Sequence, residues 1–198
     1  MHIELTEMLR CPEPHREEFL VLSTGEMLGR MVRAGVVGCP VCQKEYEIAA
    51  GVVYFGGRGK GDGAAATREP TTDAQTLQAL LDLGGPGGYV VLLGSAARHA
   101  VGLAAVMGGI HFIGVNPPPG LEELPVLSLL VCECTIPLRD AMARGVVVGS
   151  ESSRAAWLAE SRRVLLPGRR LVIENETARP DGVTQLATGQ GLFVGEKK

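Results

Sequence analysis

The hydrophobic pattern of the chain changes near residue 57. Before this point the apolar positions form short segments that are bounded by glycine-containing turns, which is typical of strands in small hairpins. The predicted turns are Ser23-Thr24-Gly25 and Ala50-Gly51. The predicted strands are 19–22, 29–33, 45–48 and 52–55. The first quarter of the chain is therefore expected to be a small β-rich unit.

After residue 73, continuous apolar runs alternate with longer helical segments, as in strands that are buried on both faces. The predicted strands are 89–93, 110–115, 126–131, 145–148 and 170–174, followed by a terminal hairpin of 183–187 and 192–194. The predicted helices are 74–83, 97–107 and 152–166, and Thr71, Thr72 or Asp73 is expected to cap the first. This alternation predicts an α/β fold: a trimmed, Rossmann-like, doubly wound and mainly parallel sheet, preceded by the β-rich unit.

Residues 58–73 separate the two patterns. They contain no apolar period and are rich in glycine, which indicates a flexible linker. We therefore predict a β-rich domain at 1–57, a linker at 58–73 and an α/β domain at 74–198. A chain of 198 residues is long enough for two small domains of this kind.

Composition narrows the function classes. No apolar run reaches the length of a membrane span, and the first residues lack an export signal, so a cytoplasmic location is expected. A net charge of −3 and an aromatic content of 4% argue against direct binding to nucleic acid. The acidity is confined to residues 1–57, which hold 5 basic and 8 acidic residues. This distribution favours a protein partner, and a homo-oligomer stays open.

The cysteines of the first quarter suggest a metal site. Cys39 and Cys42 form a C-x-x-C knuckle, which lets two thiolates bind one ion. Cys11 resembles the start of a matching knuckle, but Pro14 stands where its second cysteine is expected, and His15 follows. Cys11, His15, Cys39 and Cys42 could therefore form a zinc site, and a metal-free remnant of such a site is the alternative.

The remaining candidate residues have simpler interpretations. Cys132 and Cys134 follow an apolar strand and are expected to be buried structural thiols. His99 is expected to be a solvated helix residue, and His111 a half-buried residue with its hydrogen bonds satisfied. The arginines at 162, 163, 169 and 170 are expected to form a solvated face, with an anion or an RNA phosphate as the alternative ligand.

Four short segments of the β-rich unit match a family pattern: 8–12, the knuckle 39–42, Tyr46-Glu47-Ile48 and 51–55. Together they resemble the zinc ribbon of the small methyltransferase activators, the Trm-type adaptors. The sequence departs from that pattern at Pro14 and in a short central segment. The resemblance implies a zinc ion and docking onto a methyltransferase by strand addition and an apolar face, either on the chain's own C-terminal part or on a second chain.

Residues 161–173 lead from a predicted helix through Pro167-Gly168 into a predicted strand. This segment resembles the class I methyltransferases that depend on S-adenosylmethionine. The resemblance implies a cofactor site at the carboxyl ends of the first two strands of the domain. The implied cofactor-binding residues are Gly94, Ser95, Ala96 and Asn116.

The implied cofactor site departs from the family pattern. Only Gly94 remains of the glycine-rich loop, and Asn116 replaces the carboxylate that would bind the ribose hydroxyls. The prolines from Pro117 to Pro119 oppose the helix that usually follows. We therefore expect a non-catalytic domain that acts by protein–protein interaction, as a regulator or partner of a methyltransferase. The alternatives are an active methyltransferase with an activator in the same chain, and a binder of small ligands or anions at the strand ends.

Overall fold

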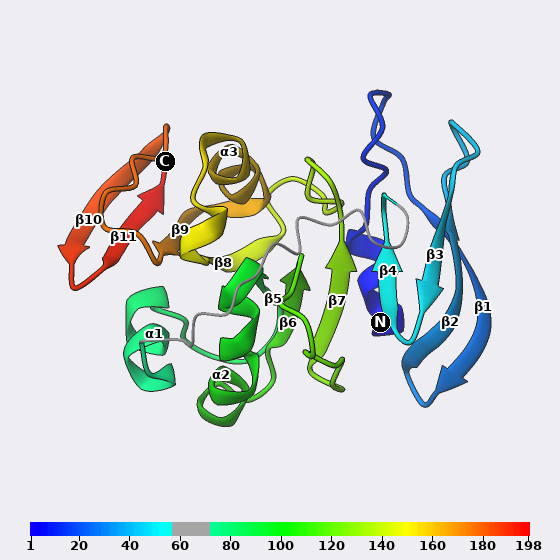
Figure 1. The fold of residues 1–198 in the computed structure, drawn as a ribbon, viewed down its shortest axis with the longest axis horizontal. Coiled ribbons are helices and arrows are strands. Elements are labelled where there is room, and N and C mark those ends of the chain that lie inside the picture. The colour runs from blue at the N-terminus through cyan, green and yellow to red at the C-terminus, as the bar shows by residue number, and fades with distance from the viewer. Residues whose placement is uncertain (57–71) are drawn as a thin grey trace.

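A mixed sheet of eleven strands runs through residues 1–56 and 72–198, the parts of the chain that the computed structural model describes (Figure 1). The predicted linker, 58–73, lies outside the described residues except for Thr72 and Asp73. The strands are β1 Val21–Leu28, β2 Met31–Gly38, β3 Glu45–Ala49, β4 Val52–Tyr54, β5 Tyr89–Leu93, β6 His111–Val115, β7 Leu127–Val131, β8 Ala143–Val148, β9 Leu165–Ile173, β10 Val183–Gly189 and β11 Leu192–Lys197. The α-helices are α1 Ala74–Leu81, α2 Ala100–Val106 and α3 Ala155–Val164, and the 3-10 helices are η1 Ile3–Met8, η2 Gly94–His99 and η3 Ser150–Ser152.

The strand order is β1-β2-β3-β4-β7-β6-β5-β8-β9-β11-β10. The five central strands from β7 to β9 are parallel, and in chain order they read 3-2-1-4-5, the order of a doubly wound sheet. The N-terminal hairpins and the terminal hairpin pair antiparallel at the two ends. The predicted α/β fold with a mainly parallel central sheet is confirmed.

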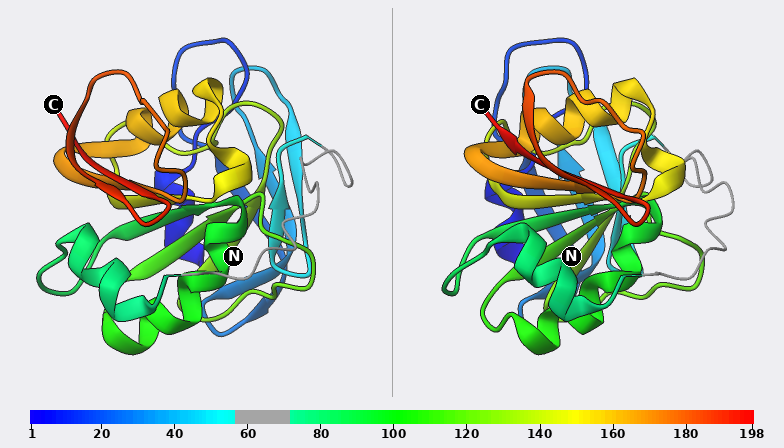
Figure 2. Two further views of the ribbon diagram at one scale, coloured as in Figure 1. Left: turned by 60° about the vertical axis from the view of Figure 1, so that its left-hand side comes forward. Right: turned by 90° about the vertical axis from the view of Figure 1, so that its left-hand side faces the viewer.

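Helices cover both faces of the parallel strands (Figure 2). Side chains alternate along β5, so Val91 and Leu93 pack in one buried cluster with Trp157 of α3, while Val90 and Leu92 pack in the other with α1 and α2. This explains why β5 is apolar at every position. Helix α1 begins at the expected cap, Asp73, whose carboxylate accepts a hydrogen bond from Thr76 N at 2.9 Å.

The N-terminal hairpins join the rest of the molecule by strand pairing. β4 pairs in parallel with β7, with Val52 opposite Leu129 and Tyr54 opposite Val131. An ion pair between Arg33 and Glu123 crosses the same junction, and the Glu123 carboxylate lies over Gly51, where a Cβ would overlap it. Of the two expected docking modes, the structure shows docking on the chain's own C-terminal part.

His111 lies beside this junction and makes it sensitive to acid. Its Nε2 is 2.9 Å from Ser128 Oγ, and its ring lies 5.2 Å from the His2 ring. Burial, followed by repulsion from His2 and the N-terminal amine, lowers the pKa of His111 to about 4. Since the unfolded chain binds this proton near pH 6.5, the pKa shift should destabilise the fold progressively as the pH falls from about 6.5 towards 4.

We therefore expect His111→Gln to remove part of the acid sensitivity. The wild type should lose about 1–2 kcal/mol more than the variant between pH 7 and pH 5. Urea unfolding at the two pH values measures the difference. Equal losses in both proteins would contradict a role for this histidine.

Three element boundaries differ from the prediction. Ser23-Thr24-Gly25 does not form a turn but lies inside β1, where the pairing register shifts around Gly25; the chain reverses between β1 and β2 at Gly29. The segment predicted as a helix from residue 97 is η2 followed by α2. Strand β9 already begins at Leu165, and Pro167-Gly168 bulges out of the ladder between residues 165 and 170.

Candidate functional site

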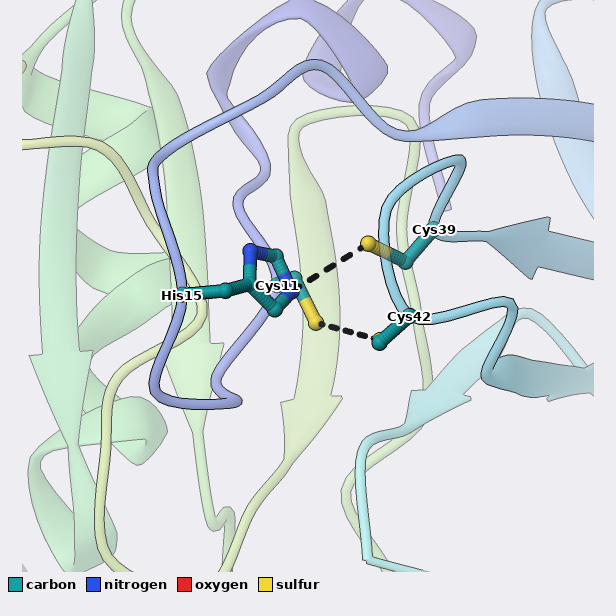
Figure 3. A group of neighbouring side chains, drawn as sticks. All are labelled: Cys11, His15, Cys39 and Cys42. Atoms are coloured by element: carbon teal, nitrogen blue, oxygen red, sulfur yellow. Dashed lines mark hydrogen bonds between the residues drawn. The ribbon is translucent and has the colours of Figure 1, made fainter.

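Four ligand side chains meet at one end of the N-terminal hairpins (Figure 3). Cys11 and His15 come from the segment between η1 and β1, and Cys39 and Cys42 from the turn between β2 and β3. Their ligand atoms all lie within 4.8 Å of one another. The structure therefore brings together the whole predicted Cys3His set, despite Pro14.

The distances within this cluster suit a tetrahedral ion. Cys11 Sγ lies 3.7 Å from Cys42 Sγ, and Cys39 Sγ lies 3.4 Å from His15 Nε2. A tetrahedral zinc with bonds of about 2.3 Å to sulfur and about 2.1 Å to nitrogen separates its ligand atoms by about 3.6–3.8 Å. The donor set and its spacing thus fit zinc.

The thiols of the cluster differ in acidity. Burial opposes ionisation of Cys39, but hydrogen bonds from the backbone N–H groups of Cys42 and Val41 outweigh it and lower the pKa of Cys39 to about 7. Burial raises the pKa of Cys11 to about 11, although the Tyr46 hydroxyl lies 3.0 Å from its sulfur. A cation would reverse the preference of Cys11, because a metal-bound thiol loses its proton.

The implied cofactor residues gather at the carboxyl edge of the parallel strands. Gly94, Ser95 and Ala96 form the first turn of η2 directly after β5, and Asn116 follows β6. All four are buried. This edge, where the chain leaves β5 and β8 in opposite directions, is where doubly wound sheets bind ligands.

The chain's own side chains take up the hydrogen-bonding groups at this edge. Glu151, from η3 after β8, accepts from Ser95 N at 2.6 Å and from Ser95 Oγ at 2.8 Å. Its carboxylate also lies against Gly94, where a Cβ would overlap it. Asn116 Oδ1 accepts from Cys132 N at 2.8 Å. Glu151 was not among the residues predicted from the sequence, although its position just after the fourth parallel strand was a usable signal.

A second pair links η2 to the residue that follows β9. His99 is only 5% exposed, and its Nε2 is 2.7 Å from Glu174 Oε1, which follows β9. The expectation of a solvated His99 is wrong, because η2 turns this side chain towards the sheet. The expectation for His111, half-buried and hydrogen-bonded, is confirmed.

Two other expectations are wrong in part. Arg163 is half-buried: it donates to Asp140 at 2.6 Å and to Glu160 at 2.7 Å, and it also binds two backbone carbonyls. It is therefore a structural crosslink and not part of a solvated face. Cys132 is buried as expected, but Cys134 is exposed.

No protein-family model and no curated protein matches the chain. Similar solved structures include methyltransferases. A complex that contains the Haloferax volcanii Trm112 methyltransferase activator is 21% identical, covers 50% of this chain and 50% of that chain, and has a TM-score of 0.40. The antibiotic-resistance methyltransferase Kmr is 15% identical, with coverage of 65% and 94% and a TM-score of 0.44. A geranyl diphosphate C-methyltransferase from Streptomyces coelicolor A3(2) is 17% identical, with coverage of 50% and 41% and a TM-score of 0.41.

The chain spans about half the length of the first of these structures. Among the helices of the described residues, none has the length and apolar character needed to cross a membrane.

Proposed function

We propose that this chain is a non-catalytic, methyltransferase-like protein with an activator-type zinc ribbon, and that it acts by binding another protein, such as a methyltransferase. The observation that carries the proposal is that the Glu151 carboxylate, from η3, hydrogen-bonds to Ser95 in the turn after β5. This loop is where the resemblance to class I methyltransferases puts S-adenosylmethionine.

Glu151 competes with a cofactor for hydrogen-bond donors. It accepts from the Ser95 N–H and hydroxyl, so a cofactor would have to displace this carboxylate to use the same donors. At the next strand, Asn116 cannot form the charge-assisted bond of a carboxylate to the ribose, and its Oδ1 already accepts from Cys132 N. Losing bonds of about 1.5–3 kcal/mol each would weaken binding by two or more orders of magnitude.

The ribbon supports a role in protein binding. Because β4 covers the edge of β7, a separate activator cannot pair with this strand while the chain stays folded as described. Several large apolar side chains of the ribbon are instead exposed, and they provide a surface for another protein. They are Phe19, Val21, Met27, Leu28 and Val41.

The zinc of the proposal would be held by Cys11, His15, Cys39 and Cys42. The zinc ion would crosslink two loops and would take no part in a reaction. A unit of 56 residues with a small apolar core is the size at which such crosslinks matter.

Titration of the metal-replete chain with S-adenosylmethionine tests the proposal. We expect no binding below about 100 µM, equivalent to a free energy weaker than about −5.5 kcal/mol. Glu151→Ala, which removes the carboxylate, should show measurable binding, whereas Glu26→Ala, at an exposed carboxylate in β1, should behave as the wild type. Low-micromolar binding by the wild type would refute the proposal.

An active methyltransferase is the second candidate. It is favoured by the His99–Glu174 pair, which lies at the same edge of the sheet and could accept a proton. Transfer of a labelled methyl group from the cofactor to any acceptor, abolished in His99→Gln, would establish it.

A further inference from the structure

A cavity of about 410 Å³ lies between α3 and the segment from Asn175 to Asp181, which follows β9. Its apolar wall includes Leu158, Ala178 and Pro180. Two arginines, Arg162 and Arg179, also line it. The volume lies within the range of about 300–1,000 Å³ that small-ligand sites occupy.

Arg162 and Arg179 are both exposed, and backbone lies close to each guanidinium group. Arg162 extends from the last turn of α3 across Gly182, where a Cβ would lie 2.5 Å from Arg162 Nη1, so this glycine leaves room for the guanidinium. Arg179 Nη1 donates to the carbonyls of Glu176 at 3.1 Å and Ala178 at 2.7 Å. Since a guanidinium has five N–H donors, each arginine keeps donors for a ligand.

The charges of the cavity are not balanced by ion pairs. In the described part of the chain, neither Arg162 nor Arg179 pairs with a carboxylate, and Asp181 is the acidic residue among those that line the cavity. Asn175 Oδ1 is occupied by the amide and hydroxyl of Thr177. The wall therefore carries two cations and one anion beside an apolar surface.

We propose that this cavity binds a small organic anion: an apolar body that packs on Leu158 and Ala178, with a carboxylate or phosphate held by Arg162 and Arg179. Guanidinium groups bind both kinds of anion with paired hydrogen bonds. The site does not involve Ser95 or Glu151, so the inference stands independently of whether the chain binds S-adenosylmethionine.

Calorimetric titration of the full chain with four probes tests this inference: phenyl phosphate, benzoate, inorganic phosphate and phenol. We expect phenyl phosphate or benzoate to bind with a Kd below about 1 mM, and the probe that binds identifies the anion class. Inorganic phosphate, which lacks the apolar body, and phenol, which lacks the charge at neutral pH, should bind at least about tenfold more weakly.

Variants locate the binding. Arg162→Gln and Arg179→Gln should each weaken it by about tenfold or more, while Arg16→Gln, at an arginine of the N-terminal unit that is 79% exposed, should not change it. Circular dichroism checks that the variants fold, and the two arginines sit on different segments, so one variant suffices if the other unfolds. Absence of binding by both organic anions, or equal binding in wild type and a folded variant, would overturn the inference.

Discussion

Replacing Cys39 with serine is expected to abolish metal binding and to lower the thermal stability of the chain sharply. Elemental analysis should find about one equivalent of zinc in the wild type and none in the variant, because a neutral hydroxyl is a much poorer zinc ligand than a thiolate. Cys39 is the thiol whose pKa is lowered to about 7, so it is a ready thiolate donor near neutral pH. The matched control is Cys134→Ser, an exposed cysteine outside the cluster, which should keep both the metal and the stability.

The expected loss is large because the cluster joins the segment before β1 to the turn between β2 and β3. Structural zinc contributes about 10–16 kcal/mol of apparent binding energy in zinc-finger peptides, although that value depends strongly on pH. In this chain the pairing of β4 with β7 also holds the N-terminal unit, so the loss should be smaller than in an isolated peptide. Metal-free wild-type protein with an unchanged melting temperature would show that the cluster has no structural role.

The elements that sequence reasoning predicted well are those with a strong local signal. Both ends of β5 were predicted correctly from its apolar run. A parallel strand that is buried on two faces needs an apolar side chain at nearly every position. The hairpin at Ala50-Gly51 was correct because both residues adopt positive φ, as a tight turn requires. The members of the metal cluster were predicted from their spacing alone, because two cysteines in a C-x-x-C knuckle have few roles other than metal binding.

The features that sequence reasoning missed depend on contacts between distant residues. Ser95 and Glu151 are 56 positions apart, and no local pattern links them. His99 lies on a segment that continues from β5, and only the position of Glu174 at the end of β9 shows why the imidazole is buried. Pro167-Gly168 was expected to end a helix, but a bulge accommodates it within β9.

The junction between the N-terminal unit and the parallel strands is the other point where a single substitution should have a large effect. Val53 is fully buried at the centre of β4, opposite Leu130 of β7, and both belong to the cluster that also contains Ile48 and Val91. An aspartate at this position would place a carboxylate among apolar side chains from both parts of the molecule.

We expect Val53→Asp to destabilise the whole chain by about 3–5 kcal/mol, the typical effect of an uncompensated buried charge. The free energy of unfolding of a native protein is about 5–15 kcal/mol, so this loss is a large fraction of the chain's stability. Urea unfolding, followed by Trp157 fluorescence and by circular dichroism, measures it; since the sheet is continuous, both signals should shift together. Val21→Asp, at a position of β1 that is 62% exposed, is the matched control and should cost less than about 1 kcal/mol. If the two variants unfold at the same urea concentration, or if Val53→Asp leaves the Trp157 transition unchanged, then the pairing of β4 with β7 does not couple the N-terminal unit to the parallel sheet.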